Sequence, residues 1–465
     1  MIISNALLGQ QKPKVPNWVI WVQCIAFVAL YAVWILPEVV GVRNTTLIVG
    51  ALFGAYVIFQ YKELFLKKNA FPGYFLLMLF AWATLHLLFI SHDFNAQWRE
   101  YLRIWKYAVI GFIFALGLGL SLAMSRDKKY WNVIYFGMCI PVTIYVVKFL
   151  LTTYGPSFGY IAPNYLQIYQ SSAPFYIPKS DYIPFCLPAL AIALGEIKHI
   201  LQTKQLNMFA SLWKMLPYLV VIFMTLLLFY VQTMKNGFLY VLLCVIVFVG
   251  FLLFEKSTKS IRQRIFLALA GVLITSVVMF VHVQQNAPWK ALMADAKIAI
   301  QLDKYDNWKY NERKGLPKNE FGLQVFGTNY QRIAWGIAGT QLSLENPLGY
   351  GLIEDSFSKL AKEKWPDSVD LSHTHSGWLD IALAIGLPGL ALILMTLLML
   401  IWQSFQVSYP WGGFVFWSLL SILFLWITTE AAQTITFVGL IFWLSFCTGL
   451  VQEQSCQSDS LRKIL

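Results

Sequence analysis

The chain has 465 residues, of which 58% are hydrophobic and only 12% are charged, and its formal net charge is +12. A soluble domain usually has about a quarter of its residues charged, so this composition excludes an ordinary soluble protein and indicates a membrane protein. We assign most of the positive charge to lysines and arginines that flank membrane spans, and we therefore expect no binding to nucleic acid.

Apolar stretches long enough to cross a bilayer recur along the whole chain. A spanning helix needs about 20 apolar residues, so we expect an all-α, polytopic membrane protein with about twelve transmembrane helices. In chain order they are 18–38, 45–61, 71–90, 105–124, 131–151, 182–197, 216–233, 238–254, 265–283, 377–402, 413–428 and 434–450. The sixth contains Pro184 and Pro188, which membrane helices tolerate where neighbours satisfy the freed carbonyl groups.

Lysine and arginine gather in alternate short loops, and positive charge marks the cytoplasmic side. The richer set of loops carries Lys62, Lys67, Lys68, Arg126, Lys128, Lys129, Lys198, Lys204, Lys214, Lys256, Lys259, Arg262 and Arg264. We therefore expect both termini in the cytoplasm and the long connections 152–181 and 284–376 outside. The chain then divides into 1–283 with nine spans, the large outer loop 284–376, and 377–465 with three spans and a cytoplasmic tail.

The large outer loop is predicted to be partly helical. Residues 289–302 and 329–344 alternate apolar and polar side chains at helical spacing, and Asn346-Pro347 ends the second stretch. An ordered loop of this length is usually functional. None of the six cysteines lies in an outer loop, so no outer disulfide is expected.

Three features of the outer face carry groups that could do chemistry. His373 and His375 precede the tenth span, Arg332 lies in the second loop helix, and Lys235 lies in the turn between spans seven and eight. A neutral histidine can accept the proton of a hydroxyl, and arginine or lysine can hold a phosphate without a metal. The combination favours a hydroxyl acceptor that attacks a substrate with a phosphate leaving group.

Other ionisable residues have both a functional and a structural interpretation. Asp380 lies about one and a half turns into the tenth span, where an acid is costly and often functional, although it could simply pair with a neighbouring cation. Arg99, Arg103 and Lys106 share one helix face at the start of the fourth span. They could bind lipid headgroups or donor phosphates, or form a solvated ladder at the interface.

A His-x-His pair such as His373 and His375 is also a zinc pattern. A third ligand would have to come from His92, His282 or Asp380, and none of them lies at a familiar spacing. We therefore expect no metal and no other cofactor.

The residues after His373 resemble the signature of the O-antigen ligase superfamily. This superfamily includes lipopolysaccharide O-antigen ligases, bacterial protein O-oligosaccharyltransferases and some O-antigen polymerases. The signature is His, then Asn, Ser or Gln, nine residues, Gly, two residues, and Gly, Thr or Tyr. It matches His375-Ser376, nine residues, Gly386, two residues and Gly389.

Two further stretches are similar to the family. One is Arg332-x-x-Trp335 followed by Glu345-Asn346-Pro347-Leu348-Gly349-Tyr350-Gly351. The other is Lys235-Asn236-Gly237, which stands where many members have a Ser-Arg-Gly-like triplet. The chain departs from the family there, because lysine keeps the charge and loses the forked geometry of arginine.

The resemblance implies a glycosyltransferase of the bacterial inner membrane. It would move a glycan en bloc from undecaprenyl diphosphate to an acceptor hydroxyl on the periplasmic face, without a metal. His375 would activate or orient the acceptor, and Arg332 and Lys235 would hold the diphosphate as its charge grows. Arg99 and Arg103 are further candidates for diphosphate binding. His373 and Asp380 are candidates for supporting roles.

The acceptor distinguishes the alternatives within the superfamily. An O-antigen ligase would use lipid A-core, a protein O-oligosaccharyltransferase a pilin or other secreted protein, and an O-antigen polymerase the growing glycan. Many protein-glycosylating members carry an extra C-terminal region, and this chain ends about fifteen residues after the last span, which favours the ligase slightly. A flippase or transporter of lipid-linked sugar is the alternative from another class, and it would need no external histidine base.

Overall fold

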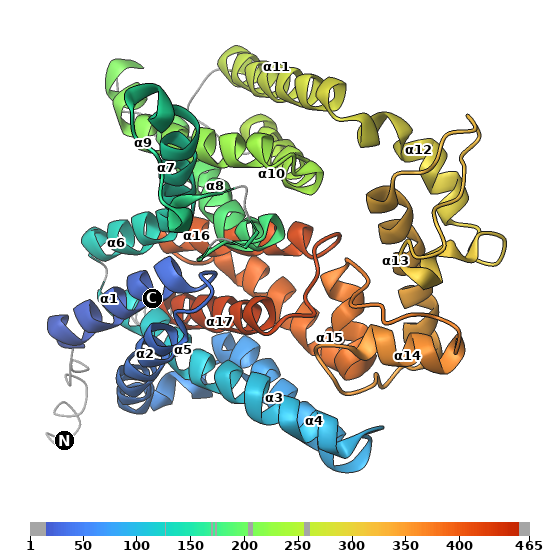
Figure 1. Ribbon diagram of the computed structural model, residues 1–465. Helices are drawn as coiled ribbons and strands as arrows, with labels where there is room; N and C mark the ends of the chain where they lie inside the picture. Colours follow the sequence, from blue (N-terminus) through green and yellow to red (C-terminus); the bar gives the residue numbers. More distant parts are fainter. Residues whose placement is uncertain are drawn as a thin grey trace, which may run out of the picture.

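The computed structural model describes residues 15–125, 127–168, 171–172, 174–202, 208–254 and 261–454. These residues are helical apart from their connections, and the β-bridge between Lys318 and Gln324 is an isolated one. The predicted all-α class is therefore confirmed for the described part of the chain (Figure 1). Five of the six cysteines are free and buried, and Cys456 lies outside the described residues.

The helices follow one another with mostly short connections. The first nine are α1 (Asn17–Val33), α2 (Val40–Gln60), α3 (Phe71–Phe89), α4 (Phe94–Glu100), α5 (Lys106–Ser125), α6 (Lys128–Met138), α7 (Ile140–Tyr154), α8 (Lys179–Gln202) and α9 (Met208–Val231). The remaining eight are α10 (Lys235–Phe254), α11 (Ile261–Gln285), α12 (Ala287–Ala299), α13 (Gly327–Glu345), α14 (Ser356–Lys364), α15 (Gly377–Ser404), α16 (Trp411–Leu425) and α17 (Thr434–Leu450). A π-helical turn, Tyr101–Trp105, joins α4 to α5.

Eight helical segments of the described chain are long and apolar enough to cross a bilayer. They are Val40–Gln60, Lys68–Phe89, Phe94–Ser125, Lys179–Gln202, Phe209–Val231, Lys235–Phe254, Arg264–Gln285 and Gly377–Ser404. The pair α6 and α7, bent by 43°, would make a ninth, and α1, α16 and α17 are shorter apolar helices. Each expected span coincides with one of these elements, but their number as spans remains a prediction.

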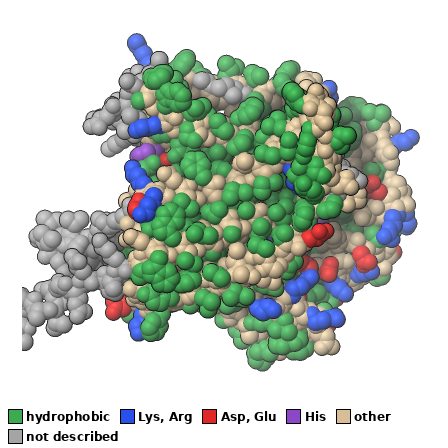
Figure 2. Space-filling model, turned by 60° about the vertical axis from the view of Figure 1, so that its left-hand side comes forward, with side chains coloured by type: hydrophobic (Ala, Val, Ile, Leu, Met, Phe, Trp, Pro, Cys, Tyr) green, Lys and Arg blue, Asp and Glu red, His purple; other side chains and the backbone are tan. Residues whose placement is uncertain are grey.

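The expected orientation rests partly on residues that the structure does not describe. Arg126, Lys204, Lys256, Lys259 and both chain ends lie outside the described residues. In the described part, hydrophobic side chains cover a broad face of the molecule and charged ones gather toward its two ends (Figure 2). This distribution is that of a protein whose middle contacts lipid.

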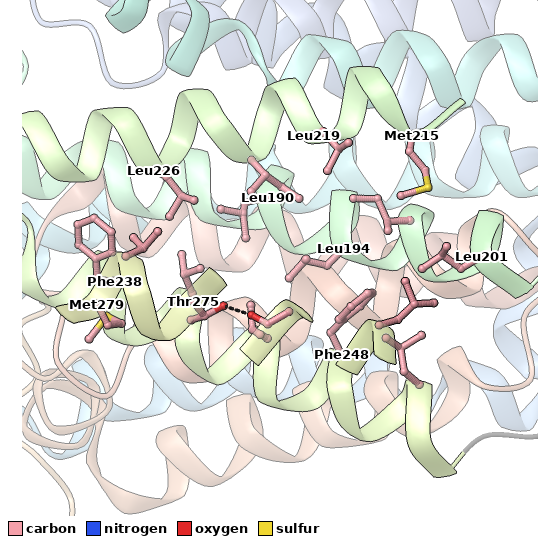
Figure 3. Close-up of a pocket in the computed structure, with 18 residues that line it drawn as sticks. Leu190, Leu194, Leu201, Met215, Leu219, Leu226, Phe238, Phe248, Thr275 and Met279 are labelled. Atoms are coloured by element: carbon pink, nitrogen blue, oxygen red, sulfur yellow. Dashed lines mark hydrogen bonds between the residues drawn. The ribbon is translucent and has the colours of Figure 1, made fainter. Parts of the chain in front are cut away.

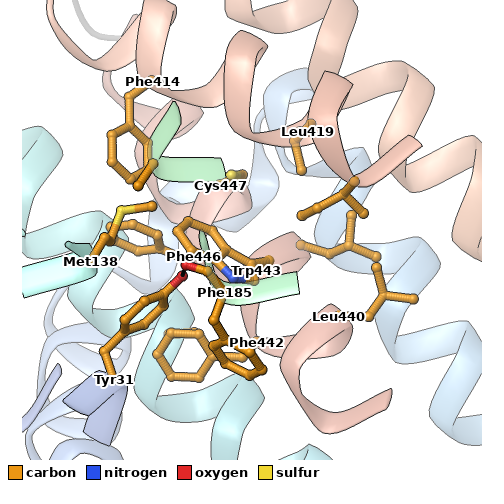
Figure 4. Close-up of a cluster of buried hydrophobic side chains, with 14 of the residues drawn as sticks. Tyr31, Met138, Phe185, Phe414, Leu419, Leu440, Phe442, Trp443, Phe446 and Cys447 are labelled. Carbon is orange, nitrogen blue, oxygen red and sulfur yellow. Dashed lines mark hydrogen bonds between the residues drawn. The ribbon is translucent and has the colours of Figure 1, made fainter. Parts of the chain in front are cut away.

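Aromatic side chains fill the centre of the helix bundle (Figure 4). Tyr31 of α1 is buried and donates its hydroxyl to the Phe185 carbonyl oxygen at 2.8 Å. The rings of Phe442 and Phe446, on α17, stack on Phe27 of α1 at centroid distances of 6.2 and 5.9 Å. A buried tyrosine needs a partner for its hydroxyl, and the bond across helices gives it one in an otherwise apolar layer.

Small residues allow the N-terminal helices to approach one another. A Cβ added to Gly117 of α5 would overlap the backbone of Gly54 of α2. Helices in membranes pack through such small residues, because lipid leaves packing as a main source of association. A Cβ added to Gly119 of α5 would likewise overlap the backbone of α17, so α5 packs closely against both α2 and α17.

The loop between α11 and α15 is helical where the sequence predicted it. The stretches expected at 289–302 and 329–344 are α12 and α13, and α13 ends at Glu345, directly before Asn346-Pro347. The short helix α14 was not predicted. Trp308, Tyr330 and Leu360 belong to a small apolar core of this loop, which lies at the right of Figure 1.

Candidate active site

The signature glycine Gly386 breaks α15. Its backbone has φ 73° and ψ 174°, which glycine adopts readily and other residues do not. Pro388 follows two residues later and cannot donate a backbone hydrogen bond. The sequence thus interrupts the helix about ten residues after its start, and the carbonyl groups just before the break need donors from elsewhere.

The Asn-Pro-Leu-Gly-Tyr-Gly stretch supplies most of those donors. The amides of Tyr350 and Gly351 donate to the carbonyls of Leu383 and Ala384 at 2.8 and 2.7 Å. Trp82 of α3 donates its indole N–H to the Ile385 carbonyl oxygen at 2.7 Å. The two stretches that resemble the superfamily are therefore two halves of one structural unit.

His375 stands in a turn that its neighbours hold in an uncommon conformation. Its φ is 61°, which is sparsely populated for residues other than glycine. Asp380 accepts from the Thr374 amide at 2.9 Å, from the Thr374 hydroxyl at 2.8 Å and from the Ala431 amide at 3.1 Å. These hydrogen bonds satisfy the buried carboxylate, so Asp380 fixes the turn and is not paired with a cation in the described chain.

Three side chains surround the His375 ring. Trp335 lies parallel to it at a centroid distance of 5.5 Å, and His373 stands edge-on at 4.4 Å. Nδ1 of His375 is 3.4 Å from Oε2 of Glu430, in the connection between α16 and α17. A carboxylate can only accept, so we assign the proton to Nδ1, and Nε2 is then free to take a proton from a hydroxyl.

The protonation states of Glu430 and His373, the two ionisable neighbours of His375, favour this arrangement. Burial alone would raise the pKa of Glu430, but the hydrogen bond from His375 and the charges of both histidines outweigh it and lower that pKa to about 2. Burial, and after it the neighbouring His375, lowers the pKa of His373. Glu430 is therefore an anion and His373 neutral at physiological pH.

His375 shares one cavity with the two predicted phosphate ligands. The cavity has a volume of about 420 Å³, and Lys235, Arg332 and His375 all line it. Nζ of Lys235 donates to Oδ1 of Asn329 at 2.6 Å, and Asn329 in turn donates to Asp295 at 2.9 Å. Arg332 has no carboxylate partner among the described residues. The cavity therefore presents two cations and a histidine, which suits an anionic ligand.

Arg99 and Arg103 do not line this cavity. Both are exposed, Arg99 in α4 and Arg103 in the π-helical turn that follows it, and Arg103 forms an ion pair with Glu354. Glu354 also accepts from the amide and hydroxyl of Thr434 at 3.0 and 2.8 Å. Glu354 of the large loop therefore contacts both Arg103 and α17, and no contact between either arginine and the cavity is found among the described residues.

The structure identifies a third residue beside the two histidines that sequence reasoning missed. His373, His375 and Glu430 offer ligand atoms that lie within 4.8 Å of one another, so they are a group that could hold a metal ion. The expected third ligands were His92, His282 and Asp380, whereas Glu430 follows His375 by 55 positions in another connection. No local pattern in the sequence connects them.

The apolar helices and this cavity define the class: a multi-pass membrane protein that gathers a histidine, a carboxylate and two cations in one site. The O-antigen ligase family model matches residues 218–394, which include Lys235, Arg332, His375 and the break at Gly386. This match supports membership in the O-antigen ligase superfamily and confirms the resemblance of the motifs. No curated protein is similar enough to the chain to count as a match.

Proposed function

We propose that the protein is an O-antigen ligase of the bacterial inner membrane. It transfers a glycan en bloc from undecaprenyl diphosphate to a hydroxyl of lipid A-core, with its site facing the periplasm and both termini in the cytoplasm. The observation that carries the proposal is the shared cavity, in which His375 with its carboxylate partner faces the same space as Arg332 and Lys235.

The reaction assigns one task to each of these groups. Nε2 of His375 takes the proton of the acceptor hydroxyl as its oxygen bonds to the first sugar carbon of the donor. The bond from that carbon to the diphosphate breaks with its electron pair, and the diphosphate leaves as an anion. Arg332 and Lys235 offset the charge that grows on it, and Glu430 stabilises the imidazolium that forms.

In this proposal no metal takes part. Lys235 and Arg332 line the cavity with His375, and in the proposal they offset the charge of the leaving group, which is the task that a metal would otherwise have. Glu430 is engaged by His375 through a hydrogen bond, and a metal between them would take away the lone pair that the base needs.

Reconstituted protein tests the proposal directly. Purified enzyme in liposomes, given an undecaprenyl-diphosphate glycan and lipid A-core, should form the glycan–lipid product, and His375→Ala should not. The exposed His92 offers the control, since it does not line the cavity and His92→Ala should transfer normally.

Product with a pilin and none with lipid A-core would assign the protein to the O-oligosaccharyltransferases. Extension of the glycan alone would make it a polymerase, and movement of donor across the bilayer without product a transporter.

A further inference from the structure

A second cavity, of about 290 Å³, lies among α8, α9, α10 and α11 (Figure 3). Its wall is apolar along its length: α10 contributes Phe238, Val241, Val245, Phe248 and Leu252. Thr275, the one polar side chain on the described wall, donates its hydroxyl to the Gly271 carbonyl oxygen at 2.8 Å. We call this cavity the apolar slot.

The dimensions of the apolar slot suit a chain and not a compact ligand. From Phe238 to Leu252 it follows α10 for about 20 Å, at a helical rise of about 1.5 Å per residue. This distance is about two thirds of a hydrocarbon core roughly 30 Å thick. A flexible apolar chain that lies along the helices would fill it.

The outer end of the apolar slot adjoins the active-site cavity. Phe238 lines the slot, and Leu239, the next residue, lines the active-site cavity together with Lys235. One turn of α10 thus forms a wall of both spaces. A molecule with an apolar chain and an anionic head could occupy both at once.

His282 lies at this junction, and one of its ring nitrogen atoms is buried without a hydrogen-bond partner. Its ring is buried 4.2 Å from that of Phe238, and its Nδ1 accepts from the indole N–H of Trp289 at 3.1 Å. Nε2 must then carry the proton, yet it has no acceptor in the described part of the chain. A buried donor without a partner is costly and points to a missing polar group near the junction.

We propose that the apolar slot binds the first part of the isoprenoid chain of the lipid-linked donor. The proposal rests on the proposed function. The order along such a donor is apolar chain, diphosphate and sugar, and the order in the protein is slot, Lys235 with Arg332, and His375. The chain in the slot thereby places the diphosphate in the active-site cavity, and the rest of a long chain stays in the bilayer.

Neighbouring residues of α10 give a matched pair of variants. Val245 lines the slot, whereas Ile246 is 56% exposed on the outside of the helix. We expect Val245→Trp to fill the slot and Ile246→Trp to leave it open. Both should be compared with the wild type on one glycan attached either to undecaprenyl diphosphate or to a diphosphate with two isoprene units.

The expected result is a change in chain-length preference. Each buried methylene contributes about 0.8 kcal/mol, so loss of a few contacts should lower the ratio of kcat/KM for the long and short donors on the order of tenfold or more in Val245→Trp. Ile246→Trp should keep the ratio of the wild type. An unchanged ratio in Val245→Trp, or an equal loss in both variants, would overturn the proposal.

A binding measurement separates this proposal from the proposed function. Undecaprenyl phosphate without glycan should remain bound to the wild type and Ile246→Trp in native mass spectrometry, and be lost from Val245→Trp. If undecaprenyl phosphate binds in this pattern but neither the wild type nor a variant transfers glycan, the result would support binding of the isoprenoid chain in the slot and overturn the proposed transferase activity. Retention of bilayer phospholipid in its place would overturn the slot. If Val245→Trp does not fold, Thr275→Phe replaces it, with the 54% exposed Val277 as Val277→Phe control.

Discussion

Glu430 lies beside the signature histidine, with its Oε2 3.4 Å from Nδ1 of His375. The carboxyl is buried, yet its pKa is lowered to about 2, so it remains an anion at any pH at which the protein would be assayed. Since its pKa is depressed from 4.5, the stabilisation it provides is present above about pH 4.5 and is lost as the pH falls toward 2. Loss of activity in mild acid must then come from other groups.

Replacing this anion should change the pH profile of transfer. In Glu430→Gln the negative charge that favours a protonated imidazole is gone, so the acidic limb of the pH–rate profile should move to lower pH. The maximal rate should fall roughly tenfold to a hundredfold, because a charge-assisted hydrogen bond contributes about 1.5–3 kcal/mol. Initial rates from pH 5 to 9 measure both effects. A lower rate with an unmoved acidic limb would leave Glu430 a structural role only.

The two histidines should differ in their effect on transfer. His375→Ala should abolish it, with a loss of at least about a hundredfold, since it removes the proposed base. His373→Ala should be milder, because His373 contacts the His375 ring edge-on and does not line the cavity. Transfer rates per amount of folded protein in membranes give the comparison. If His373→Ala is the more damaging change, the base has been assigned to the wrong ring.

The convergence of Lys235, Arg332 and His375 could be predicted because membrane topology limits the alternatives. Each was placed at the outer end of a span or in the outer loop, so the three had to lie on the same side of the bilayer. Their motifs then favoured a common site, and all three line one cavity. Topology alone does not distinguish residues of the cavity from other residues at the same membrane surface. For this reason the sequence also indicates Arg99 and Arg103 as candidates for diphosphate binding, although neither lines the cavity.

Contacts between residues far apart in the chain could not be predicted from the sequence. Glu430 belongs to the connection between α16 and α17, and nothing near it in the chain indicates a histidine as its partner. The break at Gly386 was also missed, although Gly386 and Pro388 are both visible in the sequence. Membrane helices tolerate both residues, and the donors from Trp82 and Tyr350 that make the break stable come from distant segments.

Gly386→Ala tests whether this break is required for folding. At φ 73° and ψ 174°, a region that essentially only glycine adopts, a side chain costs about 1–3 kcal/mol, and the added Cβ would also overlap the carbonyl group of Leu348. We expect less folded protein and a lower midpoint in thermal unfolding followed by size exclusion in detergent. Gly250→Ala is the control, since a Cβ at Gly250 would meet nothing within 4 Å. Equal midpoints for the two variants would show that α15 tolerates an ordinary residue at its break.

Transfer should persist after metal is removed. In the proposed reaction Arg332 and Lys235 supply the positive charge at the leaving group, so excess chelator should leave the initial rate within about twofold of the untreated enzyme. The cluster of His373, His375 and Glu430 makes the measurement decisive, because these residues could hold an ion. Activity lost in chelator and restored by one divalent cation would give His375 the role of a metal ligand in place of a base.

Arg332 and Lys235, the two cations of the cavity, should differ in how well they tolerate substitution by the other basic residue. In a forked contact, Arg332→Lys keeps the charge and loses one of two aligned hydrogen bonds, worth about 1.5–3 kcal/mol, so the rate should fall roughly tenfold to a hundredfold. Lys235 acts as a point charge held by Asn329, so Lys235→Arg should be tolerated and Lys235→Ala should cost more.

The exposed Arg313 provides the control variant Arg313→Ala. Initial rates with an undecaprenyl-diphosphate glycan in matched membranes compare the variants. Full activity in both Arg332→Ala and Lys235→Ala would mean that neither holds the diphosphate, and Arg99, Arg103 and Lys106 would then be the residues to test.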